Sequence, residues 1–350
     1  MRALLILGRY FDHHKTAFFV LILALALGGA IGPRFWQAET EGLDIYYGWV
    51  EGSRLLNGEN PYSRVLAGNM RDNDKYATHF PVFYELSALS QWAGLADYDR
   101  WIAFWRSVFL AFYLAVGAAL FCILYPRGRL LVATVAAVFW LFNRWTLHVI
   151  MIENADFIAV FLLIVSLGVL RRYPRASLLL LSFSLGLKQM AVFLIPLYLV
   201  WVWQDVGERR MRRTLLAALL IASVPVISSL PFLVWDAEGL FQSLLFSATR
   251  YPVDHFGVLS LDARLGWEGL PARLPMLALM LAIYASALRG RIGRYTASLL
   301  VMAVFIGYNS VLFLQYMVWI IPLVPLVVYD GWNQAVSAAG HARARPTGGA

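Results

Sequence analysis

Asp44 opens a segment that could hold a carboxylate at a membrane surface. Apolar residues in the range 42–56 fall close to one helical face, which predicts a helix that Gly58 and Pro61 end. The tyrosines and the tryptophan of this range are typical of a membrane–water interface. A carboxylate held there could take a proton from a hydroxyl group. Aspartate is also favoured as a helix cap, so two interpretations of Asp44 stay open, and they are compatible.

Lys188 is the second residue whose position could matter chemically. It is the only lysine in an apolar stretch, and the chain has two others, Lys15 and Lys75. A charge in the middle of a membrane costs at least about 2.5–3.5 kcal/mol on insertion scales, so we expect Lys188 to face a polar cavity or a partner. A structural ion pair with Glu153 or Asp156 is one interpretation. The other is a phosphate contact, because lysine binds phosphate as a point charge.

Two groups of polar side chains lie beside the long polar loops. Arg250 and His255 precede the segment 257–260. Arg250 could contact a phosphate, and His255 could protonate or hydrogen-bond a leaving phosphate because a histidine pKa lies near neutral. A solvated loop residue is the alternative in each case. His79, close to Tyr76 and just before an apolar run, has the same two interpretations.

A polar run, Glu153-Asn154-Ala155-Asp156, separates two apolar stretches. It could bind the hydroxyl groups of a polar ligand or form a solvated turn. Arg106 and Glu85 lie in neighbouring apolar runs, and we expect them to form a structural ion pair.

The composition excludes an ordinary soluble enzyme and a disordered chain. The 350 residues are 60% apolar and 14% charged, and the mean hydropathy is +0.65, whereas soluble domains are about 25% charged. The formal net charge of +8 does not indicate nucleic-acid binding, because the basic residues form short clusters between apolar runs. Cys122 is the single cysteine, so neither an internal disulfide nor a cysteine-based metal site is possible. The chain is therefore predicted to be an all-α, polytopic transmembrane bundle.

Ten apolar runs are candidate spans, since a spanning helix needs about 20 apolar residues. They are 17–36, 79–95, 101–124, 130–150, 156–171, 176–203, 213–234, 272–289, 295–311 and 314–329. The first could be a signal peptide, but we favour an uncleaved helix because the segment after it resembles a membrane-anchored loop. The middle stays ambiguous, because 79–95 could be re-entrant and 176–203 could be two half-spans.

Arginine clusters set the expected orientation. They place both termini in the cytoplasm and the long loops 37–78 and 235–271 outside. Residues 1–334 are expected to form one membrane domain, and 335–350 a disordered cytoplasmic tail. The preference for arginine over lysine points to a bacterial protein of the inner (plasma) membrane.

Short motifs in a fixed order resemble glycosyltransferase family 87, which contains polyprenyl-phosphate-mannose-dependent mannosyltransferases of the GT-C superfamily. The motifs are Asp44-x-Tyr46, Gly58-x-Asn60-Pro61-Tyr62, Phe80-Pro81, Gly186-Leu187-Lys188-Gln189, Gly257-Val258-Leu259-Ser260-Leu261 and Gln315-Tyr316. The resemblance covers most of the chain, and the first loop carries its most specific motif. The chain departs from the family where Glu153-Asn154 replaces a frequent Gly-Gln, and where Lys188-Gln189 replaces Lys-Pro.

The resemblance implies a GT-C-like bundle that moves a sugar, mannose in the family, from a polyprenyl phosphate to a lipid or glycan acceptor outside the membrane. It implies an inverting reaction with Asp44 as general base. Lys188, Arg250 and His255 would bind the donor phosphate. The side chains expected around the sugar and acceptor are Tyr46, Tyr47, Asn60, Tyr62, Tyr76, His79, Glu153, Gln189, Ser260 and Tyr316. No cofactor is expected, and a divalent metal is left open.

Two other function classes are alternatives to a transferase. A transporter or flippase for a polar lipid would explain the apolar runs and the buried charges, but not an acidic surface helix followed by Asn60-Pro61-Tyr62. A non-catalytic scaffold would leave Lys188 without an explanation. The sequence contains none of the motifs of nucleotide-binding loops, zinc peptidases or serine hydrolases.

Overall fold

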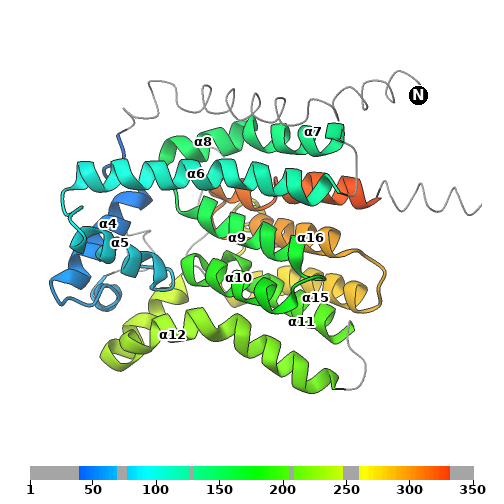
Figure 1. The fold of residues 1–350 in the computed structure, drawn as a ribbon. Helices are drawn as coiled ribbons and strands as arrows, with labels where there is room; N and C mark the ends of the chain where they lie inside the picture. The colour runs from blue at the N-terminus through cyan, green and yellow to red at the C-terminus, as the bar shows by residue number, and fades with distance from the viewer. Residues whose placement is uncertain (1–38, 69–76, 127–129, 205–208, 247–259, 332–350) are drawn as a thin grey trace, which may run out of the picture.

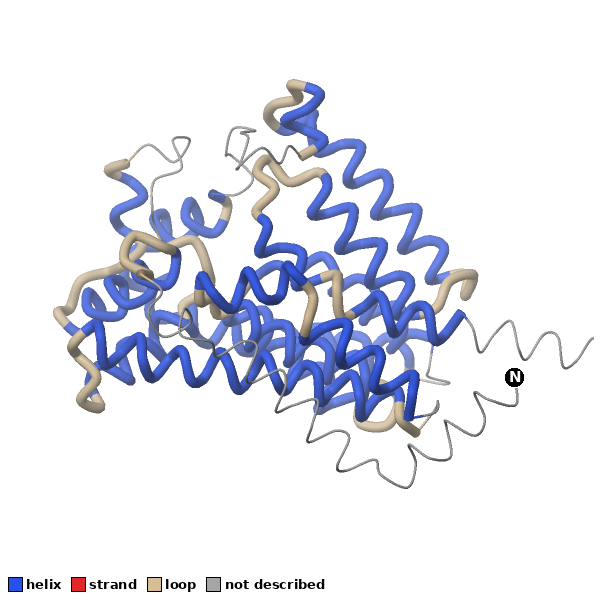
Figure 2. The backbone as a smooth tube through the Cα atoms, turned by 90° about the horizontal axis from the view of Figure 1, so that it is seen from above, coloured by secondary structure: helices blue, strands red, loops and turns tan. Residues whose placement is uncertain are grey.

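Helices form all the regular structure in the part of the chain that the computed structural model describes, which is 39–68, 77–126, 130–204, 209–246 and 260–331 (Figure 1). Figure 2 shows the same described residues from above, as helices and loops alone. The all-helical expectation is confirmed for these residues.

The first half of the bundle ends at the polar run after residue 152. Its helices are α4 (Asp44–Leu56), the 3-10 helix η1 (Ser63–Leu66), α5 (Val82–Trp92), α6 (Tyr98–Leu124), α7 (Leu130–Leu141) and α8 (Arg144–Ile152). The second half contains α9 (Asp156–Val169), α10 (Pro174–Leu187), η2 (Gln189–Leu194), α11 (Ile195–Gln204), α12 (Arg210–Leu244), α14 (Leu261–Leu265), η3 (Leu270–Arg273), α15 (Leu274–Leu288), α16 (Arg294–Gly307) and η4 (Leu314–Trp319).

Four described helices are long and apolar enough to cross a membrane. They are Tyr98–Leu124, Arg210–Leu244, Pro271–Leu288 and Leu314–Gly331, and the number becomes five if α7 and α8, bent by 46°, count as one span. The ten predicted spans are therefore not confirmed. Three of them, in α9, α10 and α16, have helices of 14 residues, which reach only about 21 Å against a hydrocarbon core of about 30 Å. The predicted span 17–36 lies outside the described residues.

The predicted span 176–203 is broken into half-helices. Helix α10 ends at Leu187, Lys188 has an extended backbone (φ −156°, ψ 121°), and η2 leads into α11. One sequence-based alternative, a pair of half-spans, matches this arrangement. Residues 79–95 contain only the 11-residue helix α5, which packs against α4.

The second long loop was predicted to begin at residue 235, which lies within a helical part of the chain. Helix α12 continues to Leu244, with a break at Asp236 (φ −159°, ψ 87°). The Asp236 Oδ1 atom accepts a hydrogen bond of 2.9 Å from the amide N of Gly239. The aspartate thus caps the second part of the helix, in the way an N-terminal cap satisfies a free amide group.

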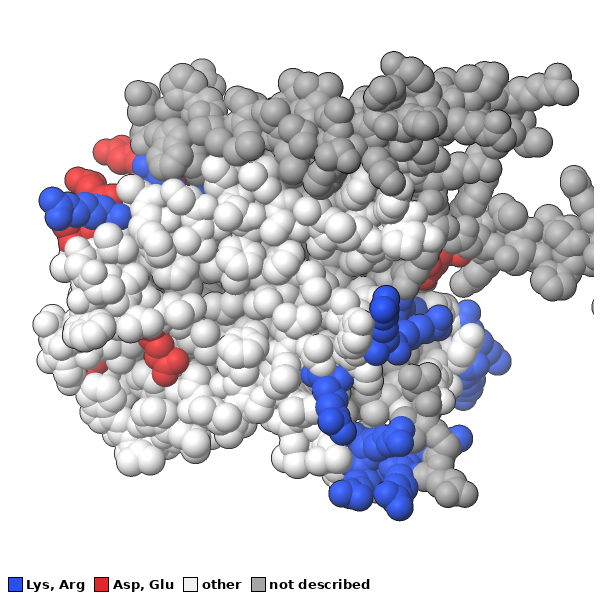
Figure 3. All heavy atoms as spheres, viewed as in Figure 1, with Lys and Arg blue, Asp and Glu red and all other residues white. Residues whose placement is uncertain are grey.

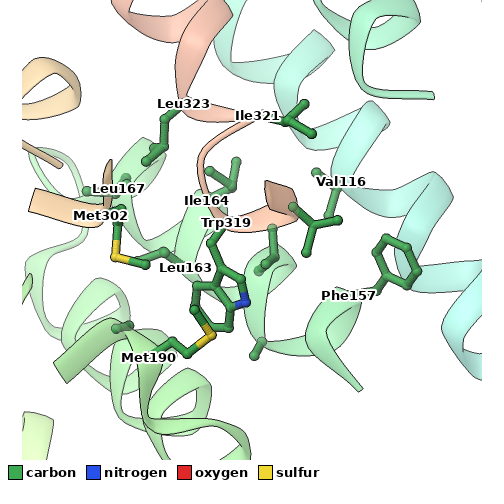
Figure 4. Close-up of a cluster of buried hydrophobic side chains, with 14 of the residues drawn as sticks. Val116, Phe157, Leu163, Ile164, Leu167, Met190, Met302, Trp319, Ile321 and Leu323 are labelled. Atoms are coloured by element: carbon green, nitrogen blue, oxygen red, sulfur yellow. The ribbon is translucent and has the colours of Figure 1, made fainter. Parts of the chain in front are cut away.

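Large aromatic side chains fill the core between the helices. The Trp140 indole nitrogen donates to the Tyr113 carbonyl at 2.8 Å, so its polar atom is satisfied. Figure 4 shows Trp319 among Met190, Leu163 and other buried apolar side chains. Helices α4 and α5 lie at one end of the bundle, and the start of α12 lies at the other (Figure 1).

Gly52 allows the close packing of α4 on α5, and its substitution should destabilise the protein. A Cβ atom there would lie 2.7 Å from the Gln91 side-chain nitrogen and closer still to Ser87. Gln91 already donates 2.8 Å to the Trp49 carbonyl and accepts 2.8 Å from Ser53. We expect Gly52→Ala to lower the unfolding free energy by about 1–3 kcal/mol, measured by thermal unfolding in detergent.

Gly307 at the end of α16 is the matched control, because a Cβ there meets nothing closer than Leu261 at 3.8 Å. Gly307→Ala should leave stability unchanged or raise it, since alanine is the better helix former. Equal losses for the two variants would contradict the close packing inferred at Gly52.

Candidate functional site

A polar cavity of about 130 Å³ lies where α4 meets the ends of several other elements. The residues that line it are Asp44, Ile45, Tyr47, Gly48, Glu51, Thr78, His79, Phe83, Tyr84, Asn154, Ala155, Leu187, Lys188, Phe246, Phe313, Gln315 and Tyr316. It can accept a phosphate or part of a sugar ring, so it is a site for a small polar group.

Asp44 lines this cavity as the first residue of α4. Leu43 occupies the cap position and makes no side-chain capping bond, so the capping interpretation of Asp44 is wrong in its strict form. The carboxylate still lies in the first helical turn, where a negative charge is favourable. Its side chain is exposed, and Oδ2 accepts a hydrogen bond of 3.3 Å from the Gln315 Nε2 atom. The carboxylate is therefore oriented by a neighbour and accessible from solvent.

Lys188 lines the same cavity from the break between α10 and η2. Only 5% of it is exposed. Its Nζ atom lies 2.7 Å from Asp156 Oδ2 and 3.3 Å from Asn154 Oδ1. The other Asp156 oxygen accepts 2.7 Å from the Trp319 indole nitrogen. Lys188 was expected to face a polar cavity or a partner, and the structure gives it both, with Asp156 as the partner.

Two amide side chains connect Lys188 to Asp44. Asn154 accepts from Lys188 and donates 3.0 Å from Nδ2 to the Gln315 Oε1 atom, and Gln315 donates to Asp44. Each amide accepts a hydrogen bond through its oxygen on the side of Lys188 and donates one through its nitrogen on the side of Asp44. All the hydrogen bonds between Lys188 and Asp44 therefore run in the same donor-to-acceptor direction. A buried ammonium and an exposed carboxylate are thus held in a fixed relative position.

His79 lies beside Lys188 in the cavity wall. Its Nδ1 atom is 2.8 Å from Gln189 Oε1, and the Gln189 Nε2 atom donates 2.6 Å to the Thr78 carbonyl. Because Gln189 Oε1 can only accept, the neutral ring carries its proton on Nδ1. Burial lowers the pKa of His79 to about 4, and the nearby Lys188 charge acts in the same direction. At neutral pH, His79 is therefore uncharged, with Nε2 as an acceptor.

Glu51 is a cavity residue that the sequence did not single out. It follows Asp44 by seven positions, which places both residues on one face of α4. This spacing in the sequence could have indicated that Glu51 lies near Asp44. Only 1% of Glu51 is exposed, and it pairs with Arg64 at 2.7 Å and Arg54 at 3.6 Å. Burial raises the pKa of Glu51 to about 6, against the opposite pull of Arg64 and Arg54.

Glu153 and Arg106 form a buried ion pair. The expected pairing of Arg106 with Glu85 is therefore wrong. Glu153 ends α8 with a positive φ of 52° and does not line the cavity. Its Arg106 partner and its full burial give it a structural role behind the site, away from the predicted contact with a sugar.

The remaining predicted site residues divide into cavity residues and supporting residues. Tyr47 and Tyr316 line the cavity. Tyr46 instead packs edge-to-face on Tyr98, with ring centroids 5.1 Å apart. Tyr62 is fully buried, and its hydroxyl donates 2.7 Å to the His79 carbonyl.

Two further predicted residues have turn and cap roles. Asn60 is buried, and its Oδ1 accepts 2.9 Å from the Tyr62 amide, so it shapes the turn before η1. Ser260 is buried and caps α14 by accepting 3.1 Å from the Ala263 amide. The remaining predicted site residues lie outside the described part of the chain: Tyr76, Arg250 and His255.

No group of three or more His, Cys, Asp or Glu side chains is placed to hold a metal ion within the described ranges. Comparisons of this chain with protein-family models, with curated proteins and with solved structures found no match.

Replacing one member of the Lys188–Asp156 pair should destabilise the protein more than replacing both members. We expect Lys188→Met or Asp156→Leu alone to cost about 3–5 kcal/mol, because each leaves a buried charge without its partner. The double variant should recover most of that loss. Unfolding free energies for the four proteins of the double-mutant cycle measure this, and additive losses would contradict direct coupling.

The low pKa of His79 predicts a loss of stability in acid. Its pKa is lower in the folded protein, about 4 against 6.5, so the unfolded chain binds the proton more readily between these values. Stability from this group is complete above pH 6.5 and falls as the pH drops toward 4, by up to about 3 kcal/mol. Wild type should therefore lose more unfolding free energy than His79→Gln from pH 7 to pH 4.5. Parallel pH profiles for the two proteins would show that His79 titrates normally.

Proposed function

We propose that the protein is an integral membrane glycosyltransferase that moves a sugar, mannose by resemblance, from a polyprenyl phosphate to a hydroxyl of a lipid or glycan acceptor. The observation that carries the proposal is one small polar cavity with both an accessible Asp44 carboxylate and the Lys188 ammonium in its wall. Those are the two groups that the resemblance assigns to the base and to the phosphate contact. The GT-C-like arrangement of the helices belongs to the same proposal.

Lys188 is suited to a phosphate by its unused donor. An ammonium has three N–H donors, and Asp156 and Asn154 account for two of them. The third can reach a phosphate oxygen in the cavity. Asp156 already balances much of the lysine charge, so the ammonium stabilises the departing phosphate mainly as a positioned donor, which costs no reorganisation during the reaction.

Asp44 is suited to the role of general base. The acceptor oxygen attacks the anomeric carbon as the bond from that carbon to the phosphate oxygen breaks, and the phosphate leaves with the bonding electrons. Asp44 takes the proton of the acceptor hydroxyl, while Gln315 holds the carboxylate by one oxygen. Attack opposite the leaving group inverts the configuration. The phosphate leaves as an anion and needs no general acid, which agrees with a neutral His79.

The distribution of charge supports an outward-facing site. The cavity lies at the end of the bundle that contains α4 and α5, whereas arginines gather at the opposite end (Figure 3). Because arginine-rich ends face the cytoplasm, we place the cavity on the outer side of a bacterial plasma membrane. A donor on that side must be lipid-linked, since nucleotide sugars stay in the cytoplasm.

Replacing Asp44 should abolish transfer without unfolding the protein. Purified wild type and Asp44→Asn are incubated with radiolabelled polyprenyl-phosphate mannose and extracted membrane glycolipids, and the products are separated by lipid chromatography. We expect wild type to form a new labelled lipid and Asp44→Asn to be slower by about 10²–10⁴-fold, which is the usual contribution of a general base.

Asp99→Asn is the matched control, because Asp99 is also an exposed acid in the first turn of a helix and does not line the cavity. It should keep full activity. Transfer that survives in Asp44→Asn would remove Asp44 as the base. Labelled donor that crosses wild-type vesicles without any transfer would favour the transporter alternative.

A further inference from the structure

A second, larger cavity of about 980 Å³ lies at the arginine-rich end of the bundle. It is enclosed by the last residues of α9, α11 and α15 and by the first residues of α10, α12 and α16. Among the residues that the structure describes, no aspartate or glutamate lines it. Figure 3 shows part of this basic surface. The arginines in its wall are Arg171, Arg175, Arg209, Arg212, Arg213, Arg291 and Arg294.

Three helices begin at this cavity without an acidic residue or a side-chain cap. The cap positions of α10, α12 and α16 are Tyr173, Arg209 and Gly293, and none of them makes a capping bond. Helix N-termini are positive and bind anions. By contrast, α4, α5, α6 and α9 each have an acidic residue in the first turn. Helix dipoles and guanidinium groups therefore add positive charge at the same place.

This charge has no internal compensation in the described part of the chain, where none of the seven arginines forms an ion pair with a carboxylate. Arg294 is the most constrained of them. Its guanidinium lies over the Tyr295 ring, 4.7 Å from the centroid, and Nη2 is 3.1 Å from the Tyr295 hydroxyl. Its Nη1 atom is buried and has no hydrogen-bond acceptor. The arrangement is that of an anion site, since a guanidinium fork matches phosphate geometry.

Apolar side chains form the rest of the wall, among them Leu178, Trp201 and Leu216. Leu178 is buried, and Leu216 is 49% exposed on the outer surface of α12. An inorganic anion would gain nothing from such a wall, whereas a phospholipid has a phosphate for the arginines and acyl chains for the leucines. The volume is within the range of small-molecule sites, about 300–1,000 Å³.

We propose that this cavity binds the phosphodiester headgroup of an anionic phospholipid, with Arg212 and Arg294 at the phosphate. The site is separate from the polar cavity at Asp44 and does not depend on the transferase proposal. Arginines anywhere at this end of the bundle would be enough to orient the protein in a membrane. A lipid-binding site makes a stronger claim: the arginines that line the cavity must contribute more to lipid affinity than the arginines outside it.

The test compares two variants that lose equal charge from the same end. Arg212→Gln/Arg294→Gln changes the cavity, and Arg172→Gln/Arg289→Gln changes exposed arginines that do not line it. Full-length proteins in neutral detergent are titrated with dioctanoyl phosphatidylglycerol, dioctanoyl phosphatidylcholine or sodium phosphate at constant ionic strength. Binding is measured by microscale thermophoresis.

We expect wild type to bind phosphatidylglycerol at least tenfold more tightly than either other ligand. The cavity variant should lose at least tenfold in affinity, and the control variant should bind as wild type does. If both variants lost the same affinity for phosphatidylglycerol, the binding would depend on overall positive charge and not on the cavity, and the proposal would be overturned. Equal binding of phosphatidylcholine, or phosphate binding as tight as that of the lipid, would overturn it as well. If the cavity variant does not fold, Arg212→Gln replaces it, because Arg212 is exposed, and its loss of affinity is compared with that of Arg172→Gln, which should bind as wild type does.

Discussion

The buried ion pair between Lys188 and Asp156 is the interaction on which the described site depends. A buried lysine without a partner would cost several kcal/mol, and here Asp156 lies 2.7 Å away with its second oxygen held by Trp319. The pair therefore ties the end of α10 to the start of α9 and to η4. Because Asn154 contacts the same ammonium, the hydrogen-bonded path to Asp44 starts from this fixed point.

The break in the helix at Lys188 makes this pair possible. An unbroken α-helix over 174–204 would point each side chain in the direction that its helical position dictates, whereas the extended backbone at Lys188 turns the ammonium toward Asp156. Irregular backbone at membrane depth is tolerated where it is buried in protein or lines a polar cavity. Glu153, with its positive φ, marks a second irregular point beside the same cavity. The site thus lies where helices end, so that side chains from several of them can converge.

Charge is distributed unevenly along the bundle, and this gives its two ends different chemistry. Helices α4 and α9 begin beside the polar cavity, each with an aspartate in the first turn. At the other end, α10, α12 and α16 each have an arginine as their first or second residue, against the ordinary preference of a helix dipole. In membrane proteins, anionic lipids attract arginines near the membrane surface and can supply compensating charge from outside the protein.

Local chemistry in the sequence was enough to predict the helical class, a helix within the range 42–56, and the need of Lys188 for a polar cavity or a partner. Each of these follows from composition, from spacing along one helix, or from the cost of one charge in an apolar run. His79 was singled out by its place beside an apolar run, whereas the family resemblance brought Tyr47 and Tyr316 into the candidate site. All three line the polar cavity.

Pairings between distant residues were decided by the tertiary structure alone. Asn154 and Gln315 are separated by 161 positions, and no local pattern specifies that their amides meet. No local pattern specifies the partner of Arg106 either, which pairs with Glu153 and not with the predicted Glu85. Burial decides these pairings, because a charged or amide group must find its partner among whatever side chains the packing of helices brings within about 3 Å. The sequence by itself determined which groups need partners, and only the packing of the helices decided which partners they have.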